Sequence, residues 1–496
     1  MKSVTARAQL FDPRLRRNDG VLLRLAVCAG AAMLVWALTG DWISALAIVV
    51  LWAIWRFLPK MEGPPVMKLA LTFQWAQVTI AVLYCGITRR RIPQMDIDYH
   101  PAMLMGLGCL LALVLGLRLG SRMVPLLQAD SIRRSILPVG WHGLALLYFA
   151  AAIVTGAVRE LAWTYPGLTQ AVYALTLIRL CVLFLVFRRL CHPFPRFGWI
   201  GAVLAIEVAV GFTGYFANFR EPVLLAIVAV LEVFNRRKGS HWLAAGGLAV
   251  GAMFLGFLWL GIRTEYRKQF NADEAFANSR VVRAQRITQL ADEWAGKGMA
   301  ERLENLDLLV SRLWTVYYPS LAINRVPEFV PHENGNLMWA SIQHVMSPRL
   351  FFPDKANMLS DSMLVRRFSG VWVHGDERAT SIAFGYFAES YIDFGIPGMF
   401  IPILLFGMLV GAALRGVMRL IRCREAGIVL VTVLAWSSLY LFERSWTKML
   451  GDTLTNLVFL GGAVLLVDRL FLAPPRSGRQ PRAPIPQFAG PARGAE

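Results

Sequence analysis

Residues 14–39, RLRRNDGVLLRLAVCAGAAMLVWALT, decide the fold class of this chain. A basic run stands directly before an apolar stretch, 21–39, which is long enough to cross the roughly 30 Å hydrocarbon core of a bilayer as a helix. No small-residue cleavage site separates this stretch from the next apolar run, so we expect a retained anchor and not a cleaved signal peptide.

The composition of the whole chain extends this conclusion. Of 496 residues, 56% are hydrophobic and only 17% are charged, and the chain holds 16 Trp and 29 Phe. A soluble protein has too little interior to bury that much apolar surface. The six cysteines show neither a disulfide framework nor a metal-type spacing. These features exclude disordered, collagen-like and disulfide-stabilised classes, and they predict an all-α polytopic membrane protein.

Apolar runs of similar length recur along the chain and predict about twelve transmembrane helices. Helices one to nine fall in residues 21–262, and the last three fall in residues 383–471 together with a re-entrant or outer helix. The predicted starts are Val21, Trp42, Val66, Pro101, Ile136, Leu168, Gly198, Glu221, His241, Ile396, Ala426 and Asp452. The second and eighth runs are short.

The net charge is +19, but the location of the basic residues, more than their sum, predicts the orientation of these helices. In a soluble domain such a charge would point to nucleic acid. Here Lys and Arg concentrate in the short segments on one side of the predicted helices, where they act as topology signals and contact anionic lipid head groups. We therefore expect membrane lipids and no nucleic acid as partners. The basic N-terminal segment 1–20 and the Pro/Arg/Gly-rich tail 472–496, which we expect to be disordered, both lie in the cytosol.

Residues 263–382 form the one long interruption, and they fall outside in this topology. They are rich in Trp, Tyr and Leu and lack the Gly/Ser tracts of a flexible linker. Apolar residues at spacings of three and four predict an amphipathic helix over 301–318 that packs on the transmembrane bundle. We expect one large, mainly helical outer loop. The basic run 89–91 is an exception to the charge rule, because it also falls outside.

Charged residues also stand where a bilayer disfavours them. Arg179 and Glu207 lie inside predicted transmembrane helices, where a charge costs on the order of 2.5–3.5 kcal/mol on insertion scales. Such residues are functional candidates unless they neutralise each other. Acid–base neighbours also stand at the outer helix ends, at Arg159–Glu160, Arg220–Glu221 and Glu443–Arg444. Surface pairing and contact with lipid phosphates are the alternatives to a ligand site there.

Two segments of the chain after residue 340 hold further candidates. In 347–355, SPRLFFPDK, prolines stiffen the backbone beside Arg349 and Lys355, and such cations suit phosphate oxygens. The second segment begins at His374 and approaches the membrane near Glu389. Histidine and carboxylates are the usual proton acceptors, although a lone loop histidine is more often merely solvated.

At these residues the chain resembles the Wzy-type polysaccharide polymerases, also called O-antigen or exopolysaccharide repeat-unit polymerases. The order of helices agrees along nearly the whole chain, whereas the motifs are loose. The resemblance rests on 214–222 (GYFANFREP), which precedes an apolar run and the basic 236–238, on 348–355 (PRLFFPDK), and on 380–398 (TSIAFGYFAESYIDFGIPG). The chain departs from the family at the second arginine-rich outer loop described for some members, where only Arg159–Glu160 is present.

The resemblance implies the fold shared by lipid-carrier-dependent glycosyltransferases and O-antigen ligases, at the outer face of a bacterial inner membrane. The enzyme would move a growing glycan from one polyprenyl pyrophosphate onto another lipid-linked repeat unit. Pyrophosphate is a good leaving group, so neither a metal nor another cofactor is required. A flippase and a chain-length-regulating copolymerase are the partners that this role implies.

The resemblance also suggests roles for individual residues. Single displacement needs one base to take the proton of the acceptor hydroxyl, for which Glu389 is the first choice and His374 the second. A helix-end carboxylate paired with a loop arginine is the alternative for Glu389. The residues expected to hold the pyrophosphate are Arg349, Lys355 and Arg220, with Arg263, Arg378 and Arg444 as weaker candidates.

Two other functions stay open at this point. An O-antigen ligase uses the same donor with a lipid A core acceptor, and sequence separates it poorly from a polymerase. A flippase or secondary transporter of lipid-linked glycan belongs to another class. It would place broken helices and polar residues at mid-membrane in both halves of the chain.

The charge distribution makes the topology testable. We expect reporter fusions at Asn334 and Met449 to lie outside and fusions at Lys238 and Arg479 to lie in the cytosol, because basic residues in short loops hold those loops inside. Paired reporters that are active on only one side of the membrane measure this. A cytosolic signal at Asn334 would remove any mechanism at the outer face.

Overall fold

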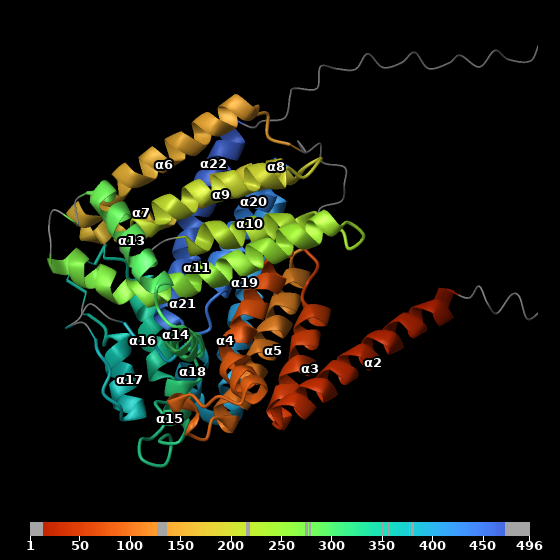
Figure 1. Ribbon diagram of the computed structural model, residues 1–496, viewed down its shortest axis with the longest axis vertical. Helices are drawn as coiled ribbons and strands as arrows, with labels where there is room; N and C mark the ends of the chain where they lie inside the picture. Colours follow the sequence, from red (N-terminus) through yellow and green to blue (C-terminus); the bar gives the residue numbers. More distant parts are fainter. Residues whose placement is uncertain are drawn as a thin grey trace, which may run out of the picture.

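The computed structural model describes residues 13–125, 136–214, 219–272, 276, 279–349, 351–352, 354–355, 357–375, 377 and 381–471. Within these ranges every regular element is helical, so the predicted all-α class is confirmed. Figure 1 shows α3, α4 and α5 side by side in one half of the molecule and α8, α9, α10 and α11 side by side in the other. The tail 472–496 and Arg378 lie outside the described residues.

Eight helical stretches of the described chain are long and apolar enough to cross a membrane, as expected for a multi-pass membrane protein. They are α2 (Pro13–Thr39), α4 (Val66–Thr88), α5 (His100–Met123), α6 (Trp141–Thr164), α7 (Thr169–Thr176) with α8 (Ile178–Cys191), α11 (Gly239–Ala272), α19 (Phe400–Leu420), and α21 (Trp446–Thr455) with α22 (Gly461–Phe471). A π-helical turn, Asn456–Leu460, joins α21 to α22.

The other four predicted membrane helices are present but shorter. They are α3 (Trp42–Phe57), α9 (Phe197–Phe212), α10 (Arg220–Glu232) and α20 (Arg424–Leu439), and none exceeds 16 residues. A helix needs about 20 residues to span the hydrocarbon core. The described chain thus shows eight helical stretches that are long enough to span a membrane, and the total of twelve spans stays a prediction.

Helices α5 and α19 approach each other so closely that their backbones touch. Each carries glycines four residues apart, Gly116 and Gly120 on α5 and Gly407 and Gly411 on α19. A Cβ added at Gly120 would lie 1.9 Å from the carbonyl oxygen of Met408, and one at Gly411 would lie 2.3 Å from that of Leu117. Small residues at this spacing let backbones approach in a bilayer, where association depends on close packing.

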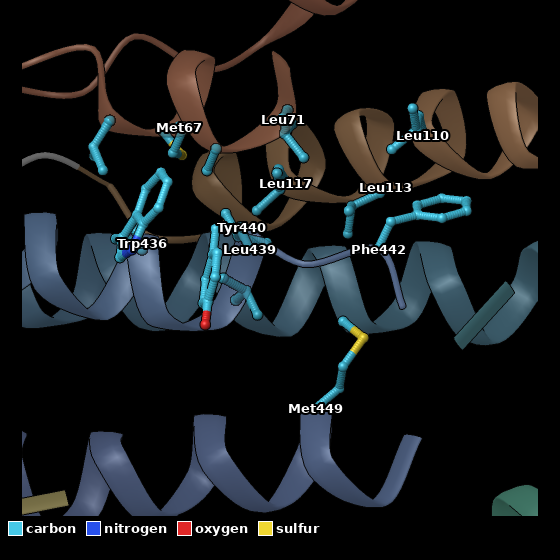
Figure 2. Close-up of a cluster of buried hydrophobic side chains, with 14 of the residues drawn as sticks. Met67, Leu71, Leu110, Leu113, Leu117, Trp436, Leu439, Tyr440, Phe442 and Met449 are labelled. Atoms are coloured by element: carbon cyan, nitrogen blue, oxygen red, sulfur yellow. The ribbon is translucent and has the colours of Figure 1, made fainter. Parts of the chain in front are cut away.

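Figure 2 shows the apolar cluster beside this contact. Leu110 and Leu113 of α5 lie opposite Leu439 and Phe442 at the end of α20, and Met449 points toward them from α21. All five side chains are fully buried. The cluster therefore fixes the start of α21 against the centre of the bundle.

The long segment 263–382 is mainly helical. The chain leaves α11 at Ala272 and forms α13 (Arg280–Ala295), α14 (Met299–Leu313), α15 (Tyr317–Ile323), α16 (Asn336–Met346) and α17 (Asp361–Ser369), and α18 (Tyr386–Gly398) follows. The predicted helix 301–318 was wrong at its end, because α14 stops at Leu313. There Trp314 turns into the bundle and its indole N–H donates to the carbonyl of Val78 in α4 at 3.1 Å.

Polar contacts sort the helix ends into two groups, as the predicted topology requires. Ends expected outside are joined by Arg90–Asp307 at 2.6 Å, Tyr99–Asp41 at 3.0 Å and Arg220–Tyr440 at 2.9 Å. Ends expected inside are joined by Arg188–Glu232 at 3.1 Å, Arg189–Glu425 at 2.6 Å and Arg424–Glu62 at 2.9 Å. Of the exceptional basic run 89–91, Arg90 thus has a partner in the long segment, and Arg89 donates to the backbone carbonyl of Leu38 at 2.9 Å. Which group faces the cytosol stays a prediction.

The glycine contact predicts a sharp difference between two similar substitutions in α19. Gly411→Ala should remove most folded protein, because its Cβ meets backbone and overpacking of a tight contact costs about 1–3 kcal/mol or more. Gly416→Ala meets nothing within 4 Å and should be neutral or stabilising. Thermal unfolding of both purified variants in detergent measures this. Equal unfolding temperatures would show that the close approach is dispensable.

Candidate functional site

Glu389 lies in a buried environment between α18 and the start of α21. Its carboxylate accepts the backbone N–H of Trp446 at 2.8 Å, and its side chain is 3% exposed. The pKa of Glu389 is raised to about 8, mainly by burial and also by the carboxylates of Asp361 and Asp393, while the Trp446 N–H and Lys448 act in the opposite direction. The alternative role for Glu389 was a helix-end carboxylate paired with a loop arginine; Glu389 does lie in the first turn of α18, but its hydrogen-bond partner is the backbone N–H of Trp446.

Two buried glutamines of α4 hold this arrangement. Tyr386 donates its hydroxyl hydrogen to the side-chain oxygen of Gln74 at 2.8 Å, and Phe442 donates its backbone N–H to that of Gln77 at 2.7 Å. Gly385, at φ +89°, allows α18 to begin where a Cβ would lie 2.5 Å from the Phe442 carbonyl. Glutamines three residues apart in an apolar run were a sequence signal that the prediction of site residues missed.

Glu389 lines a cavity of about 360 Å³, which we call the carboxylate cavity. The cavity mixes apolar side chains with hydroxyls and four titratable groups. Its lining residues are Leu337, Ala340, Ser341, His344, Met358, Leu359, Ser360, Asp361, Leu364, Ser381, Glu389, Ser445, Thr447 and Lys448.

A hydrogen-bonded triad stands on the wall of the carboxylate cavity. The ammonium group of Lys448 lies 2.5 Å from a carboxylate oxygen of Asp361 and 2.9 Å from the Ser381 hydroxyl, which itself donates to Asp361 at 3.0 Å. Asp361 and Lys448 were not predicted as site residues. For Lys448, the sequence signal that could have identified it is a lysine in the first turn of an apolar run.

Arg349 and Lys355 do not line the carboxylate cavity but lie near its lining residue His344. Lys355 donates to the backbone carbonyls of Ser347, at 2.8 Å, and His344, and Arg349 donates to the side chain of Asn357. Burial lowers the pKa of His344, and so do the nearby charges of Lys355 and Arg349. Neither cation forms an ion pair with a carboxylate of the described chain. The loop therefore keeps uncompensated positive charge next to the cavity.

Arg220 and Arg444 lie elsewhere, each over the ring of Tyr440. Their guanidinium carbons are 5.0 and 5.2 Å from the centre of its ring. Arg220 is also 3.0 Å from Glu221, and Arg444 is 3.3 Å from Asp452. They line or flank a second cavity of about 420 Å³, which we call the tyrosine cavity. Since both cations are paired, they are poorly placed to hold a pyrophosphate beside Glu389.

Two other predicted residues, His374 and Arg263, line neither cavity. His374 is exposed and does not line the carboxylate cavity. Arg263 lies on α11, where it interacts with the like charges of Arg267 and Arg312. Among the described residues, no three His, Cys, Asp or Glu side chains gather in a way that could hold a metal ion.

Asp393, which stands near Glu389 in the sequence, has a different role. Its carboxylate accepts the backbone N–H groups of Leu337, at 3.0 Å, and Met338, at 2.7 Å, and so caps the start of α16. Glu389 accepts one backbone N–H, that of Trp446, and also lines the carboxylate cavity. Of the two carboxylates, Glu389 is therefore the one placed to exchange a proton with a ligand.

The raised pKa of Glu389 predicts an effect on stability. The folded state holds a proton that the unfolded chain releases, so wild-type stability should fall relative to Glu389→Gln as the pH rises from about 5 to about 8. Thermal unfolding in detergent across this range measures the difference. Glu328→Gln, at an exposed glutamate of the same long segment, is the matched control and should run parallel to wild type. Parallel curves for Glu389→Gln as well would show an ordinary pKa.

Comparison with known proteins adds one match. The family described as "Domain of unknown function (DUF8712)" matches residues 133–449, which include every residue that lines the carboxylate cavity. No curated protein and no solved structure matches the chain. Because the match covers well over half of its length, the chain belongs to the DUF8712 family.

Proposed function

We propose that this protein joins polyprenyl-pyrophosphate-linked oligosaccharide repeat units into a polysaccharide at the outer face of a bacterial inner membrane. The observation that carries the proposal is the placement of buried Glu389 in a cavity beside the uncompensated cations Arg349 and Lys355. A proton acceptor next to an anion-attracting loop is what glycosyl transfer from a lipid pyrophosphate requires. The resemblance to Wzy-type polymerases in the same segments supports the same reaction.

In the proposed reaction, the hydroxyl oxygen of the acceptor sugar attacks the anomeric carbon of the donor glycan. The bond between that carbon and the pyrophosphate oxygen breaks, and the pyrophosphate leaves with the electron pair. The carboxylate of Glu389 takes the hydroxyl proton as the new bond forms. One displacement inverts the anomeric centre.

The leaving group gains negative charge as the bond breaks. Arg349 offers a planar fork for two phosphate oxygens and Lys355 adds a point charge. These contacts strengthen as the charge develops, which lowers the barrier more than it tightens ground-state binding. Lys448 is tied to Asp361 and serves to keep the cavity wall in place.

The pKa of Glu389 sets the direction of the pH dependence. Only the carboxylate form accepts a proton, and with a pKa of about 8 this form increases as the pH rises through neutrality. Transfer should therefore be faster at about pH 8.5 than at about pH 6.5.

Transport of a lipid-linked glycan is the second candidate, and one observation favours it. The tyrosine cavity places charged and polar groups among apolar helices, next to the interrupted stretches α7–α8 and α21–α22. Broken helices around a polar cavity are typical of transporters. A ligase remains the alternative within the same reaction class.

Deletion of the gene should leave surface glycan with single repeat units in place of long chains on an electrophoresis gel. Glu389→Gln should fail to restore the long chains, because it keeps the shape and removes the base. The exposed control Glu328→Gln should restore them fully. Protein levels in the membrane must be equal for the comparison.

Each other outcome points to a different function or residue. Restoration by Glu389→Gln together with failure of His374→Ala would transfer the role of base to His374. Long chains that accumulate unattached to lipid A core would indicate a ligase. Loss of all surface glycan, single units included, would indicate a transporter.

A further inference from the structure

The tyrosine cavity lies at the same end of the bundle as the carboxylate cavity. Its residues come from α6, from α7 and the start of α8, from the start of α10, from the end of α20, and from the second half of α21 and the residues just outside its two ends. Arg444 lines the tyrosine cavity and its neighbour Ser445 lines the carboxylate cavity. The two cavities therefore adjoin at the start of α21.

The electrostatics of the two cavities differ. Two arginines and two carboxylates line the tyrosine cavity, and each arginine has an acidic partner: Arg444 lies 3.3 Å from Asp452, and Arg179 lies 2.5 Å from Glu207. Charges neutralised in pairs exert little net attraction on an anion. The cavity is thus strongly polar without favouring either sign of charge.

Its walls hold unused hydrogen-bonding capacity. Within the described chain, the buried indole N–H of Trp436 and the Nε–H of Arg179 have no hydrogen-bond partner. Asn456, which begins the π-helical turn, lines the same space, and such turns occur frequently at functional sites. Tyr173, 44% exposed, adds an aromatic face.

From this we infer that the tyrosine cavity is a binding site for an uncharged, hydroxyl-rich ligand, namely the sugar portion of the acceptor. Each sugar hydroxyl is both donor and acceptor, so it suits a wall that offers groups of both kinds, such as the side-chain amides of Gln170 and Asn456 and the hydroxyl of Ser437. The apolar face of a pyranose fits the exposed ring of Tyr173. The identity of the sugar as an acceptor rests on the proposed function, whereas its binding in this cavity does not.

The test measures protection of a single cysteine. Ser437→Cys places a thiol in the tyrosine cavity and Ser360→Cys places one in the carboxylate cavity, both in a Cys85→Ala background, since the other five native cysteines are buried. The probes are phosphate-free oligosaccharides, prepared by acid hydrolysis of the cell's surface polysaccharide, and inorganic pyrophosphate. The readout is the rate of maleimide labelling of the purified full chain.

Oligosaccharide at about ten times its dissociation constant should slow labelling of Ser437→Cys by about tenfold, because only the empty cavity reacts. Pyrophosphate should leave that rate unchanged. Gln170→Ala, which removes an exposed amide of the cavity, should weaken the protection. The control Gln289→Ala, an exposed glutamine of α13 outside both cavities, should preserve it.

Two results would overturn the inference. Protection of Ser437→Cys by pyrophosphate and not by oligosaccharide would make the cavity an anion site. Absence of protection by either probe, while the variant unfolds at the wild-type temperature, would mean that the cavity binds no such ligand. If electrophoresis of the surface glycan contradicts the polymerase function, the labelling rates still report whether the tyrosine cavity binds a sugar. Failure of the proposed function and failure of this inference are therefore distinguishable.

Discussion

The close approach of α5 and α19 is the contact on which the rest of the structure depends. Between two helices in a bilayer no water is displaced, so association rests on van der Waals contact and on polar bonds. Four glycines allow the two backbones to touch. This fixes α19, and with it α18, which joins α19 through a kink at Gly395, where φ is +59°. Glu389 is thus held in place by a contact that involves no charged group.

Polar residues then decide how the other helices are arranged. Buried glutamines of α4 bind the chain at Tyr386 and Phe442, and ion pairs join the ends of helices that are distant in sequence. Arg90 and Asp307 are 217 residues apart and meet at 2.6 Å. In a low-dielectric surrounding an unpaired charge is costly, so such pairs specify which ends lie together.

The pairing of charges also distinguishes the carboxylate cavity from the tyrosine cavity. On one side of the start of α21, a carboxylate without a cationic partner lies near cations without an acidic partner. On the other side, every lining arginine is matched by a carboxylate. This separation of charge is the basis of the proton transfer and pyrophosphate binding that we propose for the first cavity, and the neutral balance of the second is the basis of the proposed sugar site. One helix terminus, at Trp446, contributes to both.

The sequence by itself determined the membrane class, the position of the apolar helices and the helical character of 263–382, because hydropathy and periodicity are properties of neighbouring residues. Residue chemistry also directed attention to Glu389, Arg349 and Lys355. Tertiary structure alone decided that Arg220 and Arg444 are paired around Tyr440, that Asp393 caps a helix and that Asp361 meets Lys448. Whether a charge is free or neutralised depends on partners from other helices, and no local pattern in the chain records which side chains the fold brings within hydrogen-bonding distance.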